Sequence, residues 1–127
     1  MSDTIIDVEA RFHQSLPGLA SKWRTFAEDV ESGYGLAIDN YTNSLTVRDM
    51  LDEAMGALEE SDRRWLVELA DPSDARFMRA THDDQERLLS RFKLHNDHWW
   101  WNRVPIVLGA LAGDYGIYAP DDPRRSA

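Results

Sequence analysis

The chain has 127 residues and carries 23 acidic against 14 basic side chains, which gives a net charge of −9 at neutral pH. This length predicts one domain, with a core large enough to fold without disulfides or a structural metal. No cysteine is present, which excludes disulfides, thiol catalysis and cysteine-ligated zinc. The acidic balance argues against nucleic acid as the direct ligand, because phosphate binding needs clusters of lysine and arginine.

Neither a membrane span nor a secretory signal is expected from the sequence. The longest apolar run, residues 104–112, contains Pro105 and Gly109 and is far shorter than a membrane-spanning helix. Residues 1–12 have neither the basic start nor the apolar stretch of a signal peptide. We therefore expect a cytoplasmic protein with no membrane contact.

Helical spacing of apolar residues dominates the chain and predicts an all-α fold, a compact bundle of about five to seven helices. Residues 1–118 should form a single helical domain, and residues 119–127 a loose C-terminal tail. At most one short pair of strands is expected, near the C-terminus.

The first two helices have clear boundary signals. Apolar residues at helical spacing predict a helix within residues 4–14. A second helix should begin after Ser15, with Pro17 in its first turn, and end at Gly33. Residues 34–44 are rich in glycine, asparagine and aspartate and are predicted to be a turn-rich connection.

The later elements are predicted to be shorter. A third helix is expected at residues 46–60, with Thr46 as its N-cap, and Ser61 can cap a fourth. The Asp-Pro-Ser-Asp sequence at residues 71–74 indicates a helix end followed by a new start. A further helix start is expected near Thr81, ahead of the tryptophan-rich segment.

The predicted helix at residues 46–60 has one apolar face and an opposite face that is purely acidic. At about 100° per residue, Val47, Leu51 and Leu58 align on the apolar side. The opposite side carries, in chain order, Asp49, Asp52, Glu53, Gly56, Glu59 and Glu60. No lysine or arginine shares this side, and Arg48 lies at its edge. It is either a solvated face of an acidic protein or a docking surface for a basic protein partner.

The negative charge is concentrated in this region. Residues 34–62 hold seven acids and one base, whereas residues 63–127 hold ten of each. Glu59 and Glu60 would lie at the C-terminal end of the predicted helix, where the helix dipole disfavours acids. Changing both to lysine is therefore predicted to leave folding intact or slightly improved. Gly56 would let a partner approach the helix backbone closely, although glycine destabilises a helix by about 1 kcal/mol.

Three consecutive tryptophans, Trp99, Trp100 and Trp101, form the second unusual feature. They cannot share one face of a helix or strand, so at least one should stay partly exposed or cover a second layer. Either all three pack between helices, or one is an exposed anchor for a partner, since tryptophan and arginine dominate binding interfaces. Arg103 lies four residues after Trp99 and would stack on it if a helix continues that far.

The histidines allow a metal hypothesis, although we expect neither a metal nor a cofactor. His95 and His98 are three residues apart, so one helix face could present both, and His82 could complete a site. This spacing is common by chance, and surface or capping histidines are the alternative. The HExxH zinc motif is absent, as are the motifs GxxxxGK[ST], GxGxxG and GxSxG of nucleotide binding and hydrolysis.

Three segments occur in a characteristic order: YTNSLTVRDML at residues 41–51, DARFMRAT at residues 74–81 and WWWNRVP at residues 99–105. Together they resemble a group of small, acidic, helical proteins of actinobacteria and related bacteria, some of which look like immunity proteins encoded beside polymorphic toxins. The resemblance implies a binding protein rather than an enzyme and supplies no catalytic residues. Asn102 departs from the second arginine expected in the tryptophan motif. Arg48 and Arg76 also have a structural interpretation, in which either pairs with a carboxylate between helices.

The sequence favours a non-catalytic protein, monomeric or weakly dimeric, that inhibits a basic partner by direct binding. The partner would be a toxin or another enzyme with a basic substrate cleft. The predicted partner-binding residues are the acidic face, the tryptophan run and Arg103. Two alternatives stay open. One is a small metal-dependent helical-bundle enzyme that uses His82, His95 and His98, and the other is an accessory subunit that folds fully only with its partner.

Overall fold

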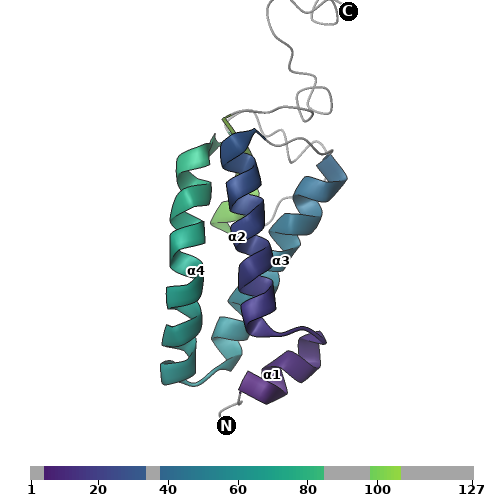
Figure 1. The fold of residues 1–127 in the computed structure, drawn as a ribbon, viewed down its shortest axis with the longest axis vertical. Helices are drawn as coiled ribbons and strands as arrows, with labels where there is room; N and C mark the ends of the chain where they lie inside the picture. The colour runs from purple at the N-terminus through teal and green to yellow at the C-terminus, as the bar shows by residue number, and fades with distance from the viewer. Residues whose placement is uncertain (1–4, 34–37, 85–97, 107–127) are drawn as a thin grey trace, which may run out of the picture.

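Four α-helices make up most of the computed structural model, which describes residues 5–33, 38–84 and 98–106. The elements are α1 (Ile5–Phe12), α2 (Leu16–Ser32), α3 (Ile38–Ala57), α4 (Glu60–Ala80), β1 (Thr81–Asp83), the 3-10 helix η2 (Trp99–Asn102) and β2 (Arg103–Pro105). In Figure 1, α2 lies between α3 and α4, and α1 crosses one end of the bundle. The all-α prediction is confirmed, with four α-helices in the described residues where five to seven were expected.

The corner between α1 and α2 is closed by side chains at the start of α2. Ser15 is the N-cap, and its Oγ accepts a hydrogen bond from the Gly18 N–H at 2.9 Å. Glu9 of α1 accepts a second one from the Leu16 N–H at 2.6 Å. A Cβ at Gly18 would lie 2.6 Å from the Ser15 Oγ, so any other residue here would have to displace the capping hydroxyl. Gly33, with φ 101°, is the C-cap, and both predicted ends of this helix are confirmed.

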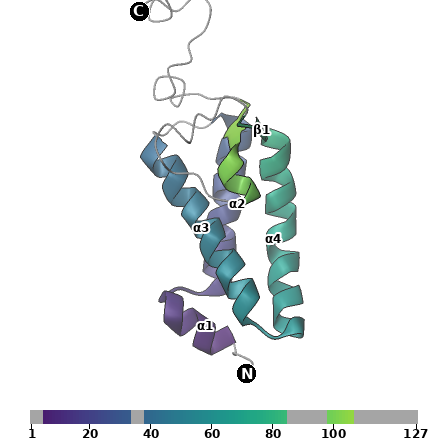
Figure 2. The ribbon, with the colours of Figure 1, turned by 180° about the vertical axis from the view of Figure 1, so that it is seen from behind.

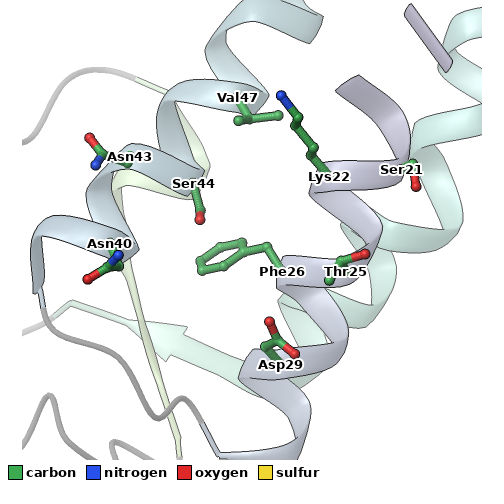
Figure 3. Close-up of a pocket in the computed structure, with 9 residues that line it drawn as sticks. All are labelled: Ser21, Lys22, Thr25, Phe26, Asp29, Asn40, Asn43, Ser44 and Val47. Atoms are coloured by element: carbon green, nitrogen blue, oxygen red, sulfur yellow. The ribbon is translucent and has the colours of Figure 1, made fainter. Parts of the chain in front are cut away.

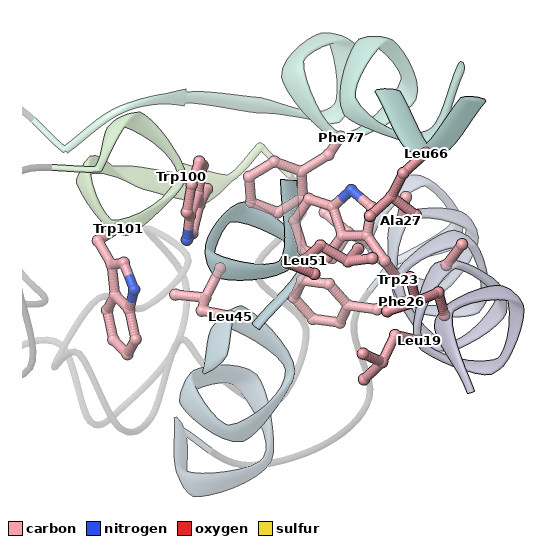
Figure 4. Close-up of a cluster of buried hydrophobic side chains, with 14 of the residues drawn as sticks. Leu19, Trp23, Phe26, Ala27, Leu45, Leu51, Leu66, Phe77, Trp100 and Trp101 are labelled. Atoms are coloured by element: carbon pink, nitrogen blue, oxygen red, sulfur yellow. The ribbon is translucent and has the colours of Figure 1, made fainter. Parts of the chain in front are cut away.

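One hydrophobic cluster joins all four helices to the segment 98–106 (Figure 4). Trp23 and Phe26 of α2 lie at its centre, with their ring centroids 5.5 Å apart. Trp23 also packs on Phe77 of α4 at 5.0 Å, and Phe26 meets Tyr41 of α3 edge-on at 5.4 Å. Burial of these rings and of the aliphatic side chains around them is the main term that stabilises the fold.

The buried side of α3 changes along the helix. Tyr41, Leu45 and Arg48 are buried in its first half, and Leu51 and Ala54 in its second half. The two sets lie roughly a third of a turn apart around the helix axis, so α3 has no continuous apolar stripe. The sequence therefore predicted the face of its second half and missed that of its first half.

Both predicted ends of this third helix are wrong. The helix begins at Ile38, inside the segment 34–44 that was expected to be a connection, and ends at Ala57. Thr46 lies in the helix interior, where its Oγ1 donates to the Thr42 carbonyl at 3.0 Å instead of capping a terminus. Complete burial of Tyr41 favours the helical conformation over the turn preference of the neighbouring asparagines.

α4 continues through Pro72, where the sequence predicted a helix end. Pro72 has no N–H to donate to the Glu68 carbonyl, a loss that typically destabilises a helix by about 3 kcal/mol. The next two residues offset this, because Ser73 is buried and Asp74 forms an ion pair with Arg48 of α3. Tertiary contacts thus keep residues 71–74 helical where local propensity would interrupt the helix.

β1 and β2 form one antiparallel pair, in which Thr81 lies opposite Pro105 and Asp83 opposite Arg103. Figure 2 shows η2 and β2 lying across the gap between α3 and α4, with α2 behind them. The part of the chain that the structure describes contains this one short pair, as predicted. Thr81, however, begins a strand where a helix start was expected.

Some predictions lie outside the described residues. They are the domain end at residue 118, the loose tail at residues 119–127, and the helix expected to follow Thr81 beyond residue 84. Within the ranges that the structure describes, no helix is both long enough and apolar enough to cross a membrane.

Candidate partner-binding surface

The acidic residues predicted to share one helix face lie on two different helices. Asp49, Asp52, Glu53 and Gly56 belong to α3, which ends at Ala57. Glu59 is the residue before α4 and Glu60 is the first residue of α4. The continuous acidic face expected over residues 46–60 is therefore interrupted by a helix boundary.

Asp52, Glu53 and Gly56 form the outward side of the second half of α3. Asp52 is half-buried and Glu53 is exposed, and neither forms an ion pair or hydrogen bond within the described part of the chain. Gly56 is exposed, and a Cβ built on it would have no atom within 4 Å. Packing within the described fold thus gives no reason for a glycine here, where alanine would stabilise the helix by about 1 kcal/mol. We call these three residues the acidic stripe.

Asp49 is half-buried and faces the tryptophans. Its Oδ1 accepts hydrogen bonds from the indole N–H groups of Trp100 at 2.7 Å and Trp101 at 2.8 Å. Its Oδ2 lies 3.0 Å from the Trp101 nitrogen. Asp49 is therefore a half-buried structural acceptor for two indoles, which corrects its prediction as a member of a solvent-facing acidic side.

Glu59 and Glu60 are placed favourably for the helix dipole, contrary to the prediction. Both are exposed and lie at the N-terminal end of α4, where unpaired N–H groups favour negative charge. Glu60 also pairs with Arg64 at 3.2 Å, one turn further along α4. The sequence placed these acids at the end of one helix, and the structure places them at the start of the next.

A basic side chain lies at the C-terminal end of α3, but it belongs to α4. Arg63 donates from its Nε to the Met55 carbonyl at 2.7 Å and from its Nη2 to the Leu58 carbonyl at 3.0 Å. These are carbonyls of the last turn of α3 and of the connection behind it, which have no partner further along the helix. The last turn of α3 has no basic residue of its own, and Arg63 of α4 takes that place.

Arg48, predicted at the edge of the acidic side, is buried at 6% exposure. Its Nε and Nη2 donate to the two carboxylate oxygens of Asp74 at 2.9 and 3.0 Å. Its guanidinium carbon lies 4.3 Å from the centre of the Trp100 ring, a cation–π contact. Asp74 also accepts from the Trp23 indole N–H at 2.7 Å. The predicted interhelical pairing of Arg48 is confirmed, and Arg76 makes longer contacts of 3.9 and 3.8 Å with Glu28 and Glu31.

The three tryptophans of the run have different environments. Trp100 and Trp101 are buried, at 2% and 6% exposure, and Figure 4 shows them beside Leu45. Trp99 is half-buried, with its ring 6.1 Å from Phe77 and edge-on to Trp100. Two of the three therefore pack inside the fold, and Trp99 is the one that reaches the surface.

Arg103 does not stack on Trp99, because η2 ends at Asn102 and Arg103 begins β2. Its guanidinium instead donates to the Thr81 hydroxyl and carbonyl, both at 2.7 Å, and to the Met78 carbonyl at 3.1 Å. It also pairs with Asp83 at 2.9 Å. Arg103 thus ties β2 to the C-terminal end of α4, which corrects its expected role beside Trp99.

The three sequence segments that suggested a family meet in one place. The segment 41–51 supplies Arg48 and Asp49, the segment 74–81 supplies Asp74, and the segment 99–105 supplies the tryptophans. Tyr41 adds a 2.8 Å hydrogen bond from its hydroxyl to the Arg103 carbonyl. The contacts of Asp49 and Asp74 with the indoles were not predicted from the sequence, although every buried indole N–H needs a hydrogen-bond acceptor. No protein-family model, curated protein or solved structure matches this chain.

The histidines of the metal hypothesis are not brought together in the described residues. His82 is exposed, and its Nδ1 lies 2.9 Å from the Asp83 carbonyl oxygen. His98 stacks on Trp100 with ring centroids 4.4 Å apart. His95 lies outside the described residues. Within the ranges the structure covers, no three histidine, aspartate or glutamate side chains are grouped in a way that could hold a metal ion.

Proposed function

We propose that this protein is a non-catalytic inhibitor that binds a basic protein directly, most concretely an immunity protein that neutralises a toxin with a basic substrate cleft. The observation that carries the proposal is the acidic stripe on α3. Asp52 and Glu53 have no basic partner in the described fold. The one base of residues 34–62, Arg48, is buried against Asp74 and contributes no positive charge to the surface.

Gly56 supports the same proposal by an independent argument, from helix stability. A glycine that weakens its own helix and fills no packing need is explained if a partner backbone approaches at that position. The exposed carboxylate of Glu59 lies in the chain just beyond the stripe and would extend the negative field. Glu60 contributes less, because Arg64 partly offsets its charge.

Trp99 is the candidate apolar anchor, because it is the tryptophan of the run that reaches the surface. The other two, together with Asp49 and Arg103, would support the surface from beneath without touching the partner. A partner that contacts both the acidic stripe and Trp99 would cover η2, which lies across the gap between α3 and α4 (Figure 2). We propose that the protein acts in this way in the cytoplasm, as a monomer or weak dimer.

The test uses the product of the neighbouring gene, if it is a basic toxin-like protein, as the binding partner. Asp52→Lys with Glu53→Lys should slow association about tenfold at low salt, with much less effect at high salt. The matched control is Glu68→Lys with Asp71→Lys on α4, which makes the same change in net charge at exposed acids that have no ion pair within the described residues. Equal slowing by both variants would reduce the effect to overall charge and contradict a local docking surface.

Two further variants separate the parts of the surface. Gly56→Ala should raise the free energy of unfolding by about 1 kcal/mol and still weaken binding, since a methyl group would stand where the partner approaches. Trp99→Ala should weaken the binding free energy by about 2 kcal/mol, the range of a central interface anchor. The loss should appear as faster dissociation and depend little on salt. A Gly56→Ala protein that binds as tightly as the parent protein would argue against close approach at α3.

A further inference from the structure

A groove of about 440 Å³ lies between α2 and α3 (Figure 3). This volume is in the range of sites that hold small molecules or short peptide segments. On α3 it is lined by residues spaced at helical intervals from Asn40 to Val47. These lie roughly on the opposite side of α3 from the acidic stripe, so the groove is a separate surface.

The floor of the groove is apolar and its walls are polar. Phe26 reaches from α2 toward α3 and, with Val47, forms the floor, as Figure 3 shows. Thr25, Asn40 and Asn43 line the walls, and none of their three side chains forms a hydrogen bond within the described residues. These hydroxyl and amide groups offer several acceptors around an apolar base.

One carboxylate in the groove, that of Asp29, has no positively charged partner within the described residues. Asp29 of α2 points toward the Phe26 ring in Figure 3 and has no ion pair in the described fold. Among the described residues that line the groove, Lys22 is the one cation, and it donates to the Gln14 amide oxygen at 2.8 Å. An anionic ligand would meet an unpaired carboxylate, whereas a cationic one would gain a partner without displacing another.

We infer that this groove binds an arginine side chain presented on a short extended segment. The methylenes of arginine would lie on Phe26 and Val47, because long basic side chains cover apolar surface with their stems. The guanidinium would reach Asp29, and its five donors match a carboxylate together with nearby amide and hydroxyl oxygens. A lysine ammonium offers three donors and no planar fork, so arginine is the better fit.

The inference rests on the proposed function, since the segment would belong to the same basic partner, but it can be tested without that partner. The probes are three blocked tripeptides, acetyl-Gly-X-Gly-amide, in which X is arginine, lysine or citrulline, a neutral isostere of arginine. Amide chemical shifts of the labelled protein should change at Thr25, Asp29, Asn40 and Asn43 on titration with the arginine peptide. The lysine peptide should bind more weakly, and the citrulline peptide more weakly still.

Two variants locate the site. Asp29→Asn should weaken the arginine peptide about fivefold, the effect of losing an ion pair of about 1 kcal/mol near the surface. Asp71→Asn on α4 makes the same charge change at an exposed acid with no ion pair in the described part of the chain, and it should leave binding unchanged.

The outcomes separate this inference from the proposed function. Equal binding of the arginine and citrulline peptides, or no effect of Asp29→Asn, would overturn the groove as an arginine site. Shifts centred on Asp52 and Glu53 would also overturn it, while supporting the acidic stripe. Binding in the groove together with normal toxin binding by the Asp52→Lys and Glu53→Lys protein would uphold the groove and refute the stripe.

Discussion

The Asp49 carboxylate accepts hydrogen bonds from two consecutive tryptophans. Both indole N–H groups donate to its Oδ1, at 2.7 and 2.8 Å, and its Oδ2 lies 3.0 Å from the second indole nitrogen. Hydrogen bonds to a charged acceptor are shorter and stronger than neutral ones. The Arg48 guanidinium packs over the Trp100 ring, 4.3 Å from the ring centre. One tryptophan is therefore held by groups of opposite charge from adjacent residues of α3.

We predict that Asp49→Asn lowers the free energy of unfolding by about 1–3 kcal/mol. The amide keeps one oxygen acceptor, but it loses the charge and turns an N–H donor toward the Trp101 indole N–H. Urea unfolding followed by far-ultraviolet circular dichroism measures the change. Tryptophan fluorescence should shift to longer wavelength before global unfolding, since both indoles would become more hydrated.

Asp52→Asn is the matched control for this prediction, one turn away on the same helix. Asp52 makes no contact of this kind in the described fold, so its substitution should change stability by less than about 0.5 kcal/mol. If both variants lose equal stability, the carboxylate–indole contacts contribute little in solution.

The sequence predicted the exposed members of the surface better than the buried ones. Glu53 and Gly56 are exposed because of helical periodicity, which is a local property of the chain. Asp49 has the same periodicity, but its partners lie 51 and 52 residues away, so no local pattern could place it. Trp99 and Trp100 could not be told apart for the same reason, since their packing depends on α3 and α4.

At the scale of elements, the boundary between α3 and α4 reverses the expected effect of the helix dipole on Glu59 and Glu60. Leu58 and Glu59 separate the two helices, so the acids that follow Leu58 begin a helix instead of ending one. Arg63 of α4 donates hydrogen bonds to the carbonyls at the end of α3. At this boundary, the end of α3 and the start of α4 therefore each have nearby side chains of the sign that the helix dipole favours.

Glu59→Lys with Glu60→Lys should therefore destabilise the protein, against the expectation from the sequence alone. The double change replaces favourable charges at the start of α4 and removes the Glu60–Arg64 pair. A loss of about 1 kcal/mol is expected, and a lower melting temperature in differential scanning calorimetry would record it.

The control is again Glu68→Lys with Asp71→Lys, in the interior of α4. It makes the same change in net charge away from the helix ends, so it reports the effect of net charge alone. A Glu59→Lys and Glu60→Lys protein that is more stable than this control would indicate that the two acids lie at the end of a helix and not at its start.

The elements that the sequence predicted well are those whose signals are local. Ser15 and Gly33 mark the ends of α2 through cap geometry that involves a few neighbouring residues. The start of α3 and the passage of α4 through Pro72 depend instead on burial of Tyr41 and on the Arg48–Asp74 pair. These are contacts between helices, and a single sequence gives no direct information about them.

At the scale of the whole molecule, the charge of −9 is a persistent source of repulsion. The buried Arg48–Asp74 pair is shielded from dissolved ions, whereas exposed acids such as Glu53, Glu59 and Glu68 are not. Net charge far from zero disfavours the compact state through self-repulsion. Salt should therefore stabilise the folded protein.

We predict that the melting temperature rises by a few degrees between about 0.01 M and 0.1 M sodium chloride, where the screening length falls from about 30 to 10 Å. The Glu68→Lys and Asp71→Lys exchange removes two negative charges and adds two positive ones, which changes the net charge from −9 to −5. This protein should therefore respond less to salt. A melting temperature that falls with salt would mean that exposed ion pairs outweigh repulsion.

The hydrogen bonds that fix α3 join residues far apart in the chain. Asp49 and Trp101 are 52 residues apart, and Tyr41 and Arg103 are 62 residues apart. Closing loops of this length opposes folding entropically, so contacts of this kind form slowly compared with those within a helix. During synthesis on the ribosome, α3 emerges well before the tryptophans that will cover it. Its helical turns can form at once, but the Asp49 carboxylate stays in contact with water until Trp100 and Trp101 have left the exit tunnel.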